Sequence, residues 1–452
     1  MWDQEEQYMT NTDIINQKSP LGKTAVLGFQ HVLVMYSAAV IVPILLGNAL
    51  NLNGKDLAFL ISADLFTCGI ATLLQVIGIG KFIGIKLPVV LGCAIITLGP
   101  MISIGKADGL PAVYGAILVS GIFVFFISFI IDKIMPFFPK IVTGSLVTII
   151  GFSLVPIALR DFGGGYSDSF GEPKNILLGS FVLLLIILIN RFFTGFVRAI
   201  AVLIGIVAGT VVASFMGMVN FDSVHQAELF HFVTPFYFGM PKFTLNGVLT
   251  MCLFLLINIV ESVGIFTVIS DICETKLDTE DYAKGIRAEA AAQVLGGVFN
   301  SFPYVTFSEN AGVMTITGVR NRYPVAAAGI ILIVLGVIPK FAALATIIPA
   351  PVLGGATIAI FGTIGANGIK LLSQVDLSKS NNLLIIATSV GLGIGTTVMP
   401  DLFTKLPELV GLLFGNGIFT GTLTAIVLNI VFNYDEIKAQ RALIKQNLGG
   451  GH

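Results

Sequence analysis

Two stretches of the sequence decide the fold. Residues 87–100 read LPVVLGCAIITLGP, and residues 302–318 read FPYVTFSENAGVMTITG. Each has a proline near its start, continues with a short run rich in β-branched or aromatic residues, and then enters a glycine-containing segment. That segment is too short to cross a bilayer, since a spanning helix needs about 20 apolar residues. We therefore predict a short strand followed by a half-helix in both places.

The two predicted strands can satisfy each other if they pair as short antiparallel β stubs. Strand edges carry unpaired N–H and C=O groups, which cannot stay exposed in hydrocarbon. Pairing would also aim the free N–H groups at the starts of both half-helices at one central place, which suits a polar or anionic ligand. Two ordinary kinked helices are the alternative interpretation.

The composition places these stretches in a membrane. Of the 452 residues, 55% are hydrophobic and only 11% are charged, and the mean hydropathy is +0.93. A soluble domain carries about 25% charged residues, so a cytosolic enzyme is excluded. The net charge of −1 provides no basic surface for nucleic acid. We expect an all-α polytopic protein whose partner is the lipid bilayer.

Apolar segments on both sides of the two stretches complete the predicted architecture. We predict fourteen transmembrane segments, at 25–47, 56–80, 87–105, 110–131, 138–159, 176–189, 200–218, 245–269, 290–302, 303–318, 325–341, 352–372, 383–399 and 417–432. An odd-numbered repeat must insert its second copy upside down, so fourteen segments predict 7+7 inverted repeats. The broken segments 3 and 10 then occupy matching places in the two repeats, which is where transporters of this kind bind substrate.

Basic residues indicate the orientation of the chain. With the N-terminus inside, the loops after even-numbered segments are cytoplasmic, and these loops carry most of the Lys and Arg residues outside the two tails. That distribution agrees with the positive-inside rule. We expect residues 1–24 and 435–452 to form cytoplasmic tails of a multi-pass protein in the cell (plasma) membrane.

Several ionisable residues fall inside the predicted segments. A carboxylate at the centre of a membrane helix costs about 2.5–3.5 kcal/mol, so such residues usually face a cavity and have a function. Glu261 lies well inside segment 8, and Glu309 begins the half-helix of segment 10. Structural roles stay open for Glu309 as a residue near the helix start, for Glu289 at an interface before segment 9, and for Asp64 as a bond to a neighbouring helix. His31 lies inside segment 1.

These residue types suit proton-coupled transport. A carboxyl group away from water holds its proton more tightly, and an ionised one accepts ring N–H groups. The residues alone therefore predict a proton-linked carrier of a small polar solute and leave its identity open. The sequence contains no His–Glu metal cluster, no serine-nucleophile elbow and no phosphate-binding loop, so we expect neither an enzyme nor a cofactor or metal site.

One motif resembles a known family. Residues 309–312 read ENAG, and after four more residues Thr317 and Gly318 follow. This resembles the signature of the nucleobase–ascorbate transporters (nucleobase:cation symporter-2), and the Gln30-His31 pair also resembles the family pattern. The similarity covers nearly the whole chain. It is closest to bacterial xanthine permeases, through LGFQH at 27–31, LPVVLGC at 87–93, PAPVLGG at 349–355 and VMPD at 398–401.

The resemblance implies a division into two domains. Segments 1–4 and 8–11 would form a core domain (25–131 and 245–341). Segments 5–7 and 12–14 would form a gate domain (132–218 and 342–434), and 219–244 would be an extracellular loop. The resemblance further implies an elevator-like movement of the core against the gate, a homodimer, and a substrate site between segments 3, 8 and 10.

The resemblance also implies roles for single residues. Glu261 would hold ring N–H groups of a purine base, and Glu309 would make the second side-chain contact. Further substrate contacts are expected at Phe307, Ser308, Asn310 and Ala94, and proton coupling at His31, Glu261 and Glu289.

Three positions depart from the family pattern. Many purine-transporting members have Gln where Glu309 stands, and Glu there resembles uracil carriers. Gly318 resembles the purine members, whereas Ile265 replaces an Asp or His of several relatives. We predict a proton-coupled importer of xanthine or a related oxopurine. Uric acid, uracil, and an anion carrier or channel on the same architecture stay open as alternatives.

Overall fold

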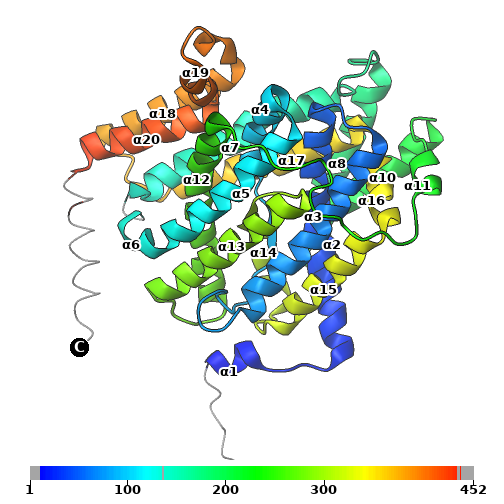
Figure 1. The fold of residues 1–452 in the computed structure, drawn as a ribbon, viewed down its shortest axis with the longest axis horizontal. Helices are drawn as coiled ribbons and strands as arrows, with labels where there is room; N and C mark the ends of the chain where they lie inside the picture. Colours follow the sequence, from blue (N-terminus) through cyan, green and yellow to red (C-terminus); the bar gives the residue numbers. More distant parts are fainter. Residues whose placement is uncertain (1–10, 135–136, 435–437, 439–452) are drawn as a thin grey trace, which may run out of the picture.

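The structure is a computed structural model that describes residues 11–134, 137–434 and 438. Of the expected tails, residues 1–10 of the first (1–24) and all residues of the second (435–452) except 438 lie outside the described residues. The described chain is mostly helical (Figure 1). It contains one two-stranded sheet.

Eight of the described helices are long and apolar enough to cross a membrane. They are α2 (Leu21–Ala49), α3 (Gly54–Ile77), α5 (Leu110–Ile127) with the turns after it, α7 (Lys140–Phe162), α8 (Pro173–Phe192), α12 (Leu245–Ile272), α17 (Ala350–Leu372) and α18 (Ser380–Val398). A bent pair of helices is a candidate ninth span, and α10 (Ala201–Phe215) and α20 (Gly417–Phe432) are apolar but shorter. The fold is thus that of a polytopic membrane protein, and the count of fourteen spans and the inverted repeat stay predictions.

Further helical elements, most of them shorter, connect these helices. They are α1 (Asn11–Asn16), η1 (Ile95–Thr97), α4 (Leu98–Asp108), η2 (Ser128–Ile130), α6 (Ile131–Ile134), α9 (Gly195–Ala199), α11 (Asp222–Gln226), α13 (Thr279–Phe299), α14 (Ser308–Thr317), α15 (Tyr323–Val337), α16 (Pro339–Thr346), η4 (Pro400–Phe403) and α19 (Glu408–Phe414).

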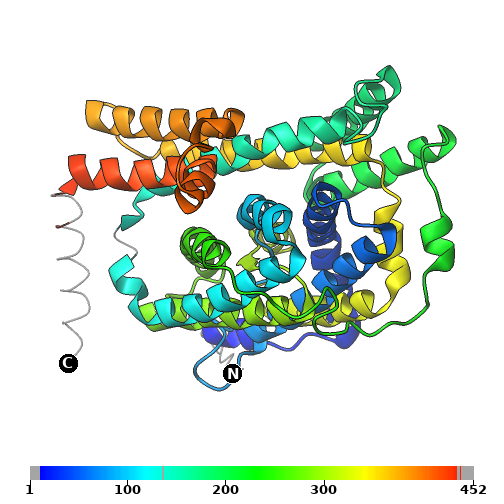
Figure 2. The ribbon, with the colours of Figure 1, turned by 45° about the horizontal axis from the view of Figure 1, so that its top comes forward.

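The helices fall into two groups by their packing. In the first group, α7 packs against α17, α18 and α20, and α17 packs against α8 and α10. In the second group, α3 packs against α13 and α15, α5 against α12 and α13, and α2 against α15. Figure 2 shows the two groups as an upper and a lower layer.

The strands predicted in the two broken segments are present and pair. β1 (Leu91–Cys93) and β2 (Tyr304–Thr306) are antiparallel, with Gly92 opposite Val305. Both strands are buried, and each runs on into a short helix, η1 and α4 after β1 and α14 after β2. The prediction of paired antiparallel stubs followed by half-helices is confirmed, and the alternative of two kinked helices is excluded.

Side chains of neighbouring helices satisfy the outer edges of this sheet. The Leu91 N–H donates to the Thr72 hydroxyl at 3.2 Å, and the Leu91 carbonyl accepts from the Cys68 thiol at 2.7 Å. On the other edge, the Tyr304 carbonyl accepts from the Asn258 amide at 2.9 Å. An unpaired backbone group costs several kcal/mol in hydrocarbon. The polar residues on α3 and α12 therefore allow a short sheet to be buried among apolar helices.

The ninth segment begins earlier than predicted. The prediction placed it at 290–302, whereas α13 covers Thr279–Phe299. Asp278 accepts the N–H of Asp281, and the Asp281 side chain accepts the N–H of Asp278, which closes a capping box. The charged stretch before Ala290 is therefore helical. As a consequence, Glu289 lies in the middle of a helix and is fully buried, not at an interface.

The eleventh segment is bent. The prediction treated 325–341 as one segment, but α15 and α16 meet at an angle of 78°. Pro339, the first residue of α16, lacks an N–H group and disfavours helical geometry in the residue before it. These properties explain why the helix breaks there.

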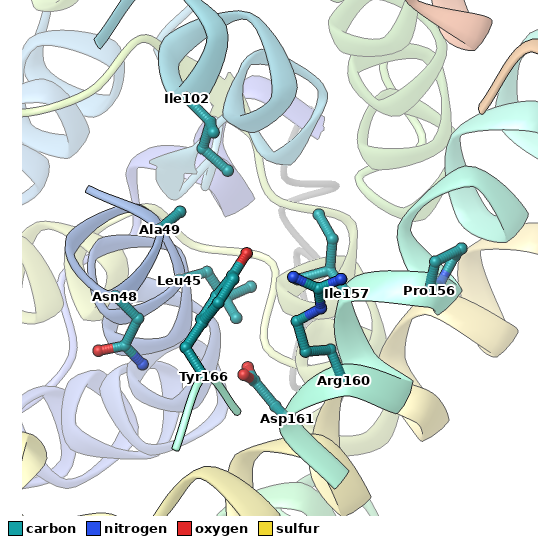
Figure 3. Close-up of a pocket in the computed structure, with 9 residues that line it drawn as sticks. All are labelled: Leu45, Asn48, Ala49, Ile102, Pro156, Ile157, Arg160, Asp161 and Tyr166. Atoms are coloured by element: carbon teal, nitrogen blue, oxygen red, sulfur yellow. The ribbon is translucent and has the colours of Figure 1, made fainter. Parts of the chain in front are cut away.

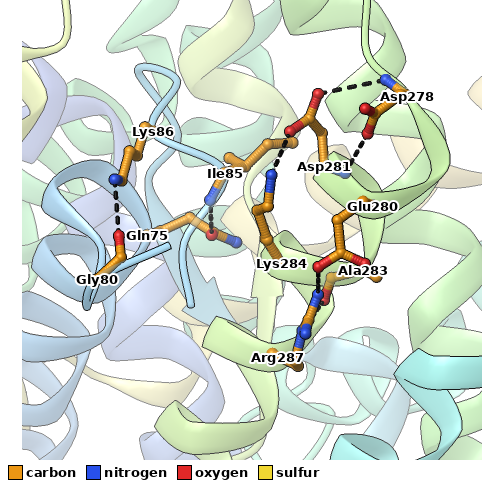
Figure 4. Close-up of polar contacts among 10 residues, drawn as sticks. All are labelled: Gln75, Gly80, Ile85, Lys86, Asp278, Glu280, Asp281, Ala283, Lys284 and Arg287. Atoms are coloured by element: carbon orange, nitrogen blue, oxygen red, sulfur yellow. Dashed lines mark hydrogen bonds and ion pairs between the residues drawn. The ribbon is translucent and has the colours of Figure 1, made fainter. Parts of the chain in front are cut away.

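The loop between α3 and β1 is held against the start of α13 (Figure 4). The Gln75 amide donates to the Gly285 carbonyl at 3.1 Å and accepts the N–H of Ile85 at 3.1 Å. The Gly84 N–H donates to the Lys284 carbonyl at 3.0 Å. These bonds connect the two halves of the chain at one end of the lower layer.

We expect Arg287→Ala to lower the free energy of unfolding by about 2 kcal/mol, because Arg287 joins the same region through a buried charge. Arg287 is only 1% exposed, forms an ion pair with Glu280 (Figure 4), and lies 4.0 Å from the centre of the Phe82 ring. Thermal unfolding in detergent measures the change. Arg287→Lys keeps the charge but loses the planar fork, so an intermediate loss is expected. An alanine variant as stable as the wild type would contradict this role.

Candidate functional site

Glu261 and Glu309 come together at the start of α14. Glu261 lies on α12, Glu309 lies in the first turn of α14, and the two helices pack against each other. Their carboxyl groups are close enough to act on each other electrostatically. Two like charges repel strongly where water is scarce. A proton, or N–H donors of a bound molecule, would relieve this repulsion.

Glu261 belongs to an accessible stripe on α12. Glu261 and Ile265 are half-buried, and Gly264 and Val268 are exposed. The spacing of these four residues places them on one face of the helix. The flanking residues of α12 on its other faces are mostly buried. Glu261 therefore faces accessible space rather than the packed interior.

The start of α14 offers hydrogen-bond donors beside this carboxyl group. Its N-cap, Phe307, supplies no side-chain hydrogen bond, and the Phe307 N–H itself donates to the Val90 carbonyl at 2.9 Å. The N–H groups of the next three residues have no carbonyl within the helix to bind. Ser308 and Glu309 are exposed, and the Ser308 hydroxyl donates to Glu309 Oε2 at 3.1 Å. Donors and acceptors thus lie in one place.

Phe307 packs directly on the sheet at Gly92. Phe307 is 5% exposed, and a Cβ atom at residue 92 would overlap its ring. The glycine therefore permits the close approach that sets the position of the ring and of the helix start behind it.

We expect Gly92→Ala to weaken substrate binding about 10-fold, because a displaced Phe307 shifts the donors of α14 away from Glu261. The half-saturation concentration for uptake and equilibrium binding measure the effect. Gly391→Ala is the matched control, since a Cβ at this exposed glycine of α18 meets nothing within 4 Å. Equal effects of the two substitutions would contradict the role of Gly92.

Glu289 lies behind the sheet and continues the series of acidic groups. Its Oε1 accepts from the Thr306 hydroxyl at 2.7 Å, and its Oε2 has no hydrogen-bond partner among the described residues. Glu289 and Glu261 also act on each other electrostatically. Glu261 thus interacts electrostatically with Glu309 and with Glu289.

Asn310 and His31 are buried polar residues with unpaired atoms. Asn310 is 0% exposed, and neither atom of its amide has a partner within the described part of the chain. His31 lies on α2, which packs against α14 and β1, and its Nδ1 is likewise unpaired. Such groups cost about 1–3 kcal/mol each, which favours a function for both. No hydrogen bond between described residues joins His31 to an acid.

The backbone of Ala94 is already engaged. Its N–H donates to the Pro303 carbonyl at 2.9 Å, and its carbonyl accepts the N–H and hydroxyl of Thr97 at 3.0 and 2.7 Å. These bonds fix the turn from β1 into the half-helix. A hydrogen bond from Ala94 to substrate stays a prediction and would require exchange of one of these partners.

A buried network beneath the sheet was not predicted. Asp64 is 0% exposed; its Oδ1 accepts from the hydroxyls of Ser301 and Tyr304 at 3.0 and 3.1 Å. Its Oδ2 accepts from the Cys93 thiol at 2.8 Å. Asp64 thus bonds to residues of both strands. The signal in the sequence was the presence of Cys93 and Tyr304, which carry hydrogen-bonding groups, within two mostly apolar stubs.

The fold is that of membrane transporters of known structure. The transmembrane domain of the cyanobacterial bicarbonate transporter BicA matches with a TM-score of 0.58 and 16% identity, over 92% of this chain and 100% of that chain. Murine Slc26a9, an anion transporter, matches with a TM-score of 0.60 and 13% identity, over 92% of this chain and 69% of that one. At these identities the likeness shows the fold alone.

The chain belongs to the Permease family (Xan_ur_permease), whose family model matches residues 22–402. The nucleobase transporter PlUacP of Paenibacillus larvae subsp. larvae is 51% identical over 91% of this chain and 94% of that protein. The xanthine permease and the uric acid permease PucK of Bacillus subtilis are each 48% identical, over 92% and 90% of this chain and 95% and 94% of their own lengths. The predicted membership of the nucleobase–ascorbate transporters is confirmed, and the relatives are transporters rather than enzymes.

Proposed function

We propose that this protein imports xanthine or a closely related oxopurine together with protons. The observation that carries the proposal is that Glu261 on α12 and Glu309 in the first turn of α14 lie on two helices that pack against each other, where α14 begins with unpaired N–H groups. An oxopurine presents N–H donors next to carbonyl acceptors around a flat ring. The two carboxylates match the donors, and the N–H groups of α14 match the acceptors.

The remaining expected contacts fit the same arrangement. Phe307 borders the ring from the sheet side, and Ser308 offers its N–H beside Glu309. Asn310 supports the site from within the helix, and Ala94 contributes through its backbone after the exchange described above. The names of relatives support the substrate class, since one 48% identical is a xanthine permease and another a uric acid permease. Uric acid is the alternative within the same chemistry.

Proton coupling follows from the crowding of the acids. Three carboxyl groups in series cannot all be ionised at low cost in a site with little water. Binding of the base to ionised Glu261, and release when a proton arrives, would link the two movements. Glu289 and His31 are proposed to hold or pass that proton.

We propose that the core domain (25–131 and 245–341) moves against the gate domain (132–218 and 342–434) in an elevator-like step. The separate packing of the two helix groups supports this division, because few tight contacts would have to break. A homodimer in the plasma membrane, with an extracellular loop at 219–244 and cytoplasmic tails at 1–24 and 435–452, completes the proposal.

Uptake by purified protein in liposomes tests the function. Labelled xanthine should accumulate when the outside is more acidic than the inside, and a protonophore should abolish the accumulation. Competition by xanthine, uric acid, hypoxanthine, guanine and uracil then ranks the bases. Absence of uptake of every base, or uptake that ignores the proton gradient, would contradict the proposal. Electrical fluxes far above carrier rates would instead favour a channel.

A further inference from the structure

A cavity of about 250 Å³ lies between the two layers, away from Glu261 and Glu309. One wall is the end of α7 and the turn after it, with Ile157, Arg160, Asp161 and Tyr166. The opposite wall comes from α2 and α4, which belong to the other layer. In the orientation that the basic residues predict, this cavity opens on the outer side of the membrane.

Asp161 gives this cavity an unpaired acceptor. It is 3% exposed, and its Oδ2 has no hydrogen-bond partner among the described residues. Figure 3 shows its carboxyl group directed into the cavity. A buried carboxylate oxygen without a partner costs more than about 1–3 kcal/mol, the cost for a neutral group. No hydrogen bond among the described residues offsets that cost, whereas a hydrogen bond from a ligand N–H group would offset it.

Donors and a flat surface surround that acceptor. The Arg160 guanidinium lies 4.7 Å from the centre of the Tyr166 ring, and both side chains are exposed at the mouth of the cavity (Figure 3). No ion pair joins Arg160 to Asp161 in the described part of the chain, so each can bind a separate ligand atom. The Asn48 amide on α2 can donate and accept across the cavity.

We propose that this cavity is a second, outer binding site for the oxopurine, occupied before the base reaches Glu261. The inference rests on the proposed function. An oxopurine edge places an N–H beside a carbonyl, which suits Asp161 and Arg160 together, and its flat ring can stack on Tyr166. A simple inorganic anion is disfavoured, because the Asp161 carboxylate would repel it.

The walls of the cavity come from both helix layers, which relates ligand binding there to the relative position of the layers. Because its walls come from both layers, the complete site exists only while the layers hold this relative position. Binding there stabilises that arrangement by as much as the affinity differs between the two states. The outer site therefore favours the relative position of the two layers that this structure has.

Cysteine labelling tests the proposal directly. Ile157→Cys places a thiol in the cavity wall, and a membrane-impermeant maleimide added from outside reports its accessibility. At a xanthine concentration ten times the dissociation constant, labelling should slow about tenfold. The protection should persist when Glu261→Gln has disabled the central site, and it should disappear with Asp161→Asn or with Tyr166→Ala. The parent protein without the added cysteine is the control for background labelling.

The outcomes separate this inference from the proposed function. If wild-type protein takes up xanthine but Ile157→Cys is not protected, or if Glu261→Gln removes the protection, the outer site is overturned and the transport function stands. If wild-type protein takes up no purine base, both fall. Tyr166→Ala changes an exposed side chain, so a folding defect is not expected. In uptake assays it should raise the half-saturation concentration for external xanthine and leave the maximal rate unchanged.

Discussion

Glu261→Gln is expected to reduce xanthine uptake at least about 100-fold. Gln keeps the size of the side chain but replaces a charged acceptor with an amide whose NH₂ group faces the ring N–H donors. Hydrogen bonds to a charged group contribute about 1.5–3 kcal/mol each, and the loss of two corresponds to about 3–6 kcal/mol. The variant also cannot bind or release a proton at this position, so residual exchange should no longer respond to the proton gradient.

Glu309→Gln is the matched control for this prediction, since it makes the same chemical change on the facing helix. Many purine-transporting relatives of the kind that the signature resembles have Gln at this position. We therefore expect Glu309→Gln to keep xanthine uptake within about 10-fold of the wild type and to discriminate more strongly against uracil. Initial rates in liposomes and equilibrium binding measure both variants. Unchanged uptake in Glu261→Gln would remove Glu261 from the site.

Asp64→Leu is expected to lower the free energy of unfolding by about 4 kcal/mol. Asp64 accepts hydrogen bonds from Cys93, Ser301 and Tyr304, which come from both broken segments. Leu removes every acceptor at once and leaves buried donors without this partner. The thermal unfolding midpoint in detergent and the fraction of monodisperse protein measure the change.

Two further variants separate this network from simple packing. Asp64→Asn keeps one oxygen for Ser301 and Tyr304, so we expect a smaller loss than for leucine. Thr67→Val removes the hydroxyl that lies 2.5 Å from the Tyr304 hydroxyl and that also donates to the Ala63 carbonyl, and it is expected to cost about 1 kcal/mol. If Asp64→Leu unfolds at the wild-type temperature, Asp64 does not hold the sheet together.

The prediction and the structure agree on the two broken segments and differ at the start of α13. The paired stubs could be predicted because hydrocarbon allows no unpaired strand edge, and the two short proline-led runs occupy matching places in the two halves of the chain. The start of α13 was misplaced because charged residues such as Glu280 and Asp281 read as a loop, whereas a capping box and an ion pair keep them helical. The incorrect expectation that Glu289 lies at an interface followed from that error.

The sequence by itself determined the membrane class, the two broken segments and the family, and it singled out Glu261 and Glu309 as the acids of the proposed site. These features follow from composition, from local runs of residues and from a motif, all of which are readable along the chain. Only the tertiary structure decided which residues from distant segments lie together. These are the hydrogen-bond network of Asp64, the electrostatic interaction of Glu261 with Glu289, and the lining of the cavity around Asp161. Each of these depends on the register of segments far apart in sequence, and side-chain periodicity carries no information about which distant helix a given face will contact.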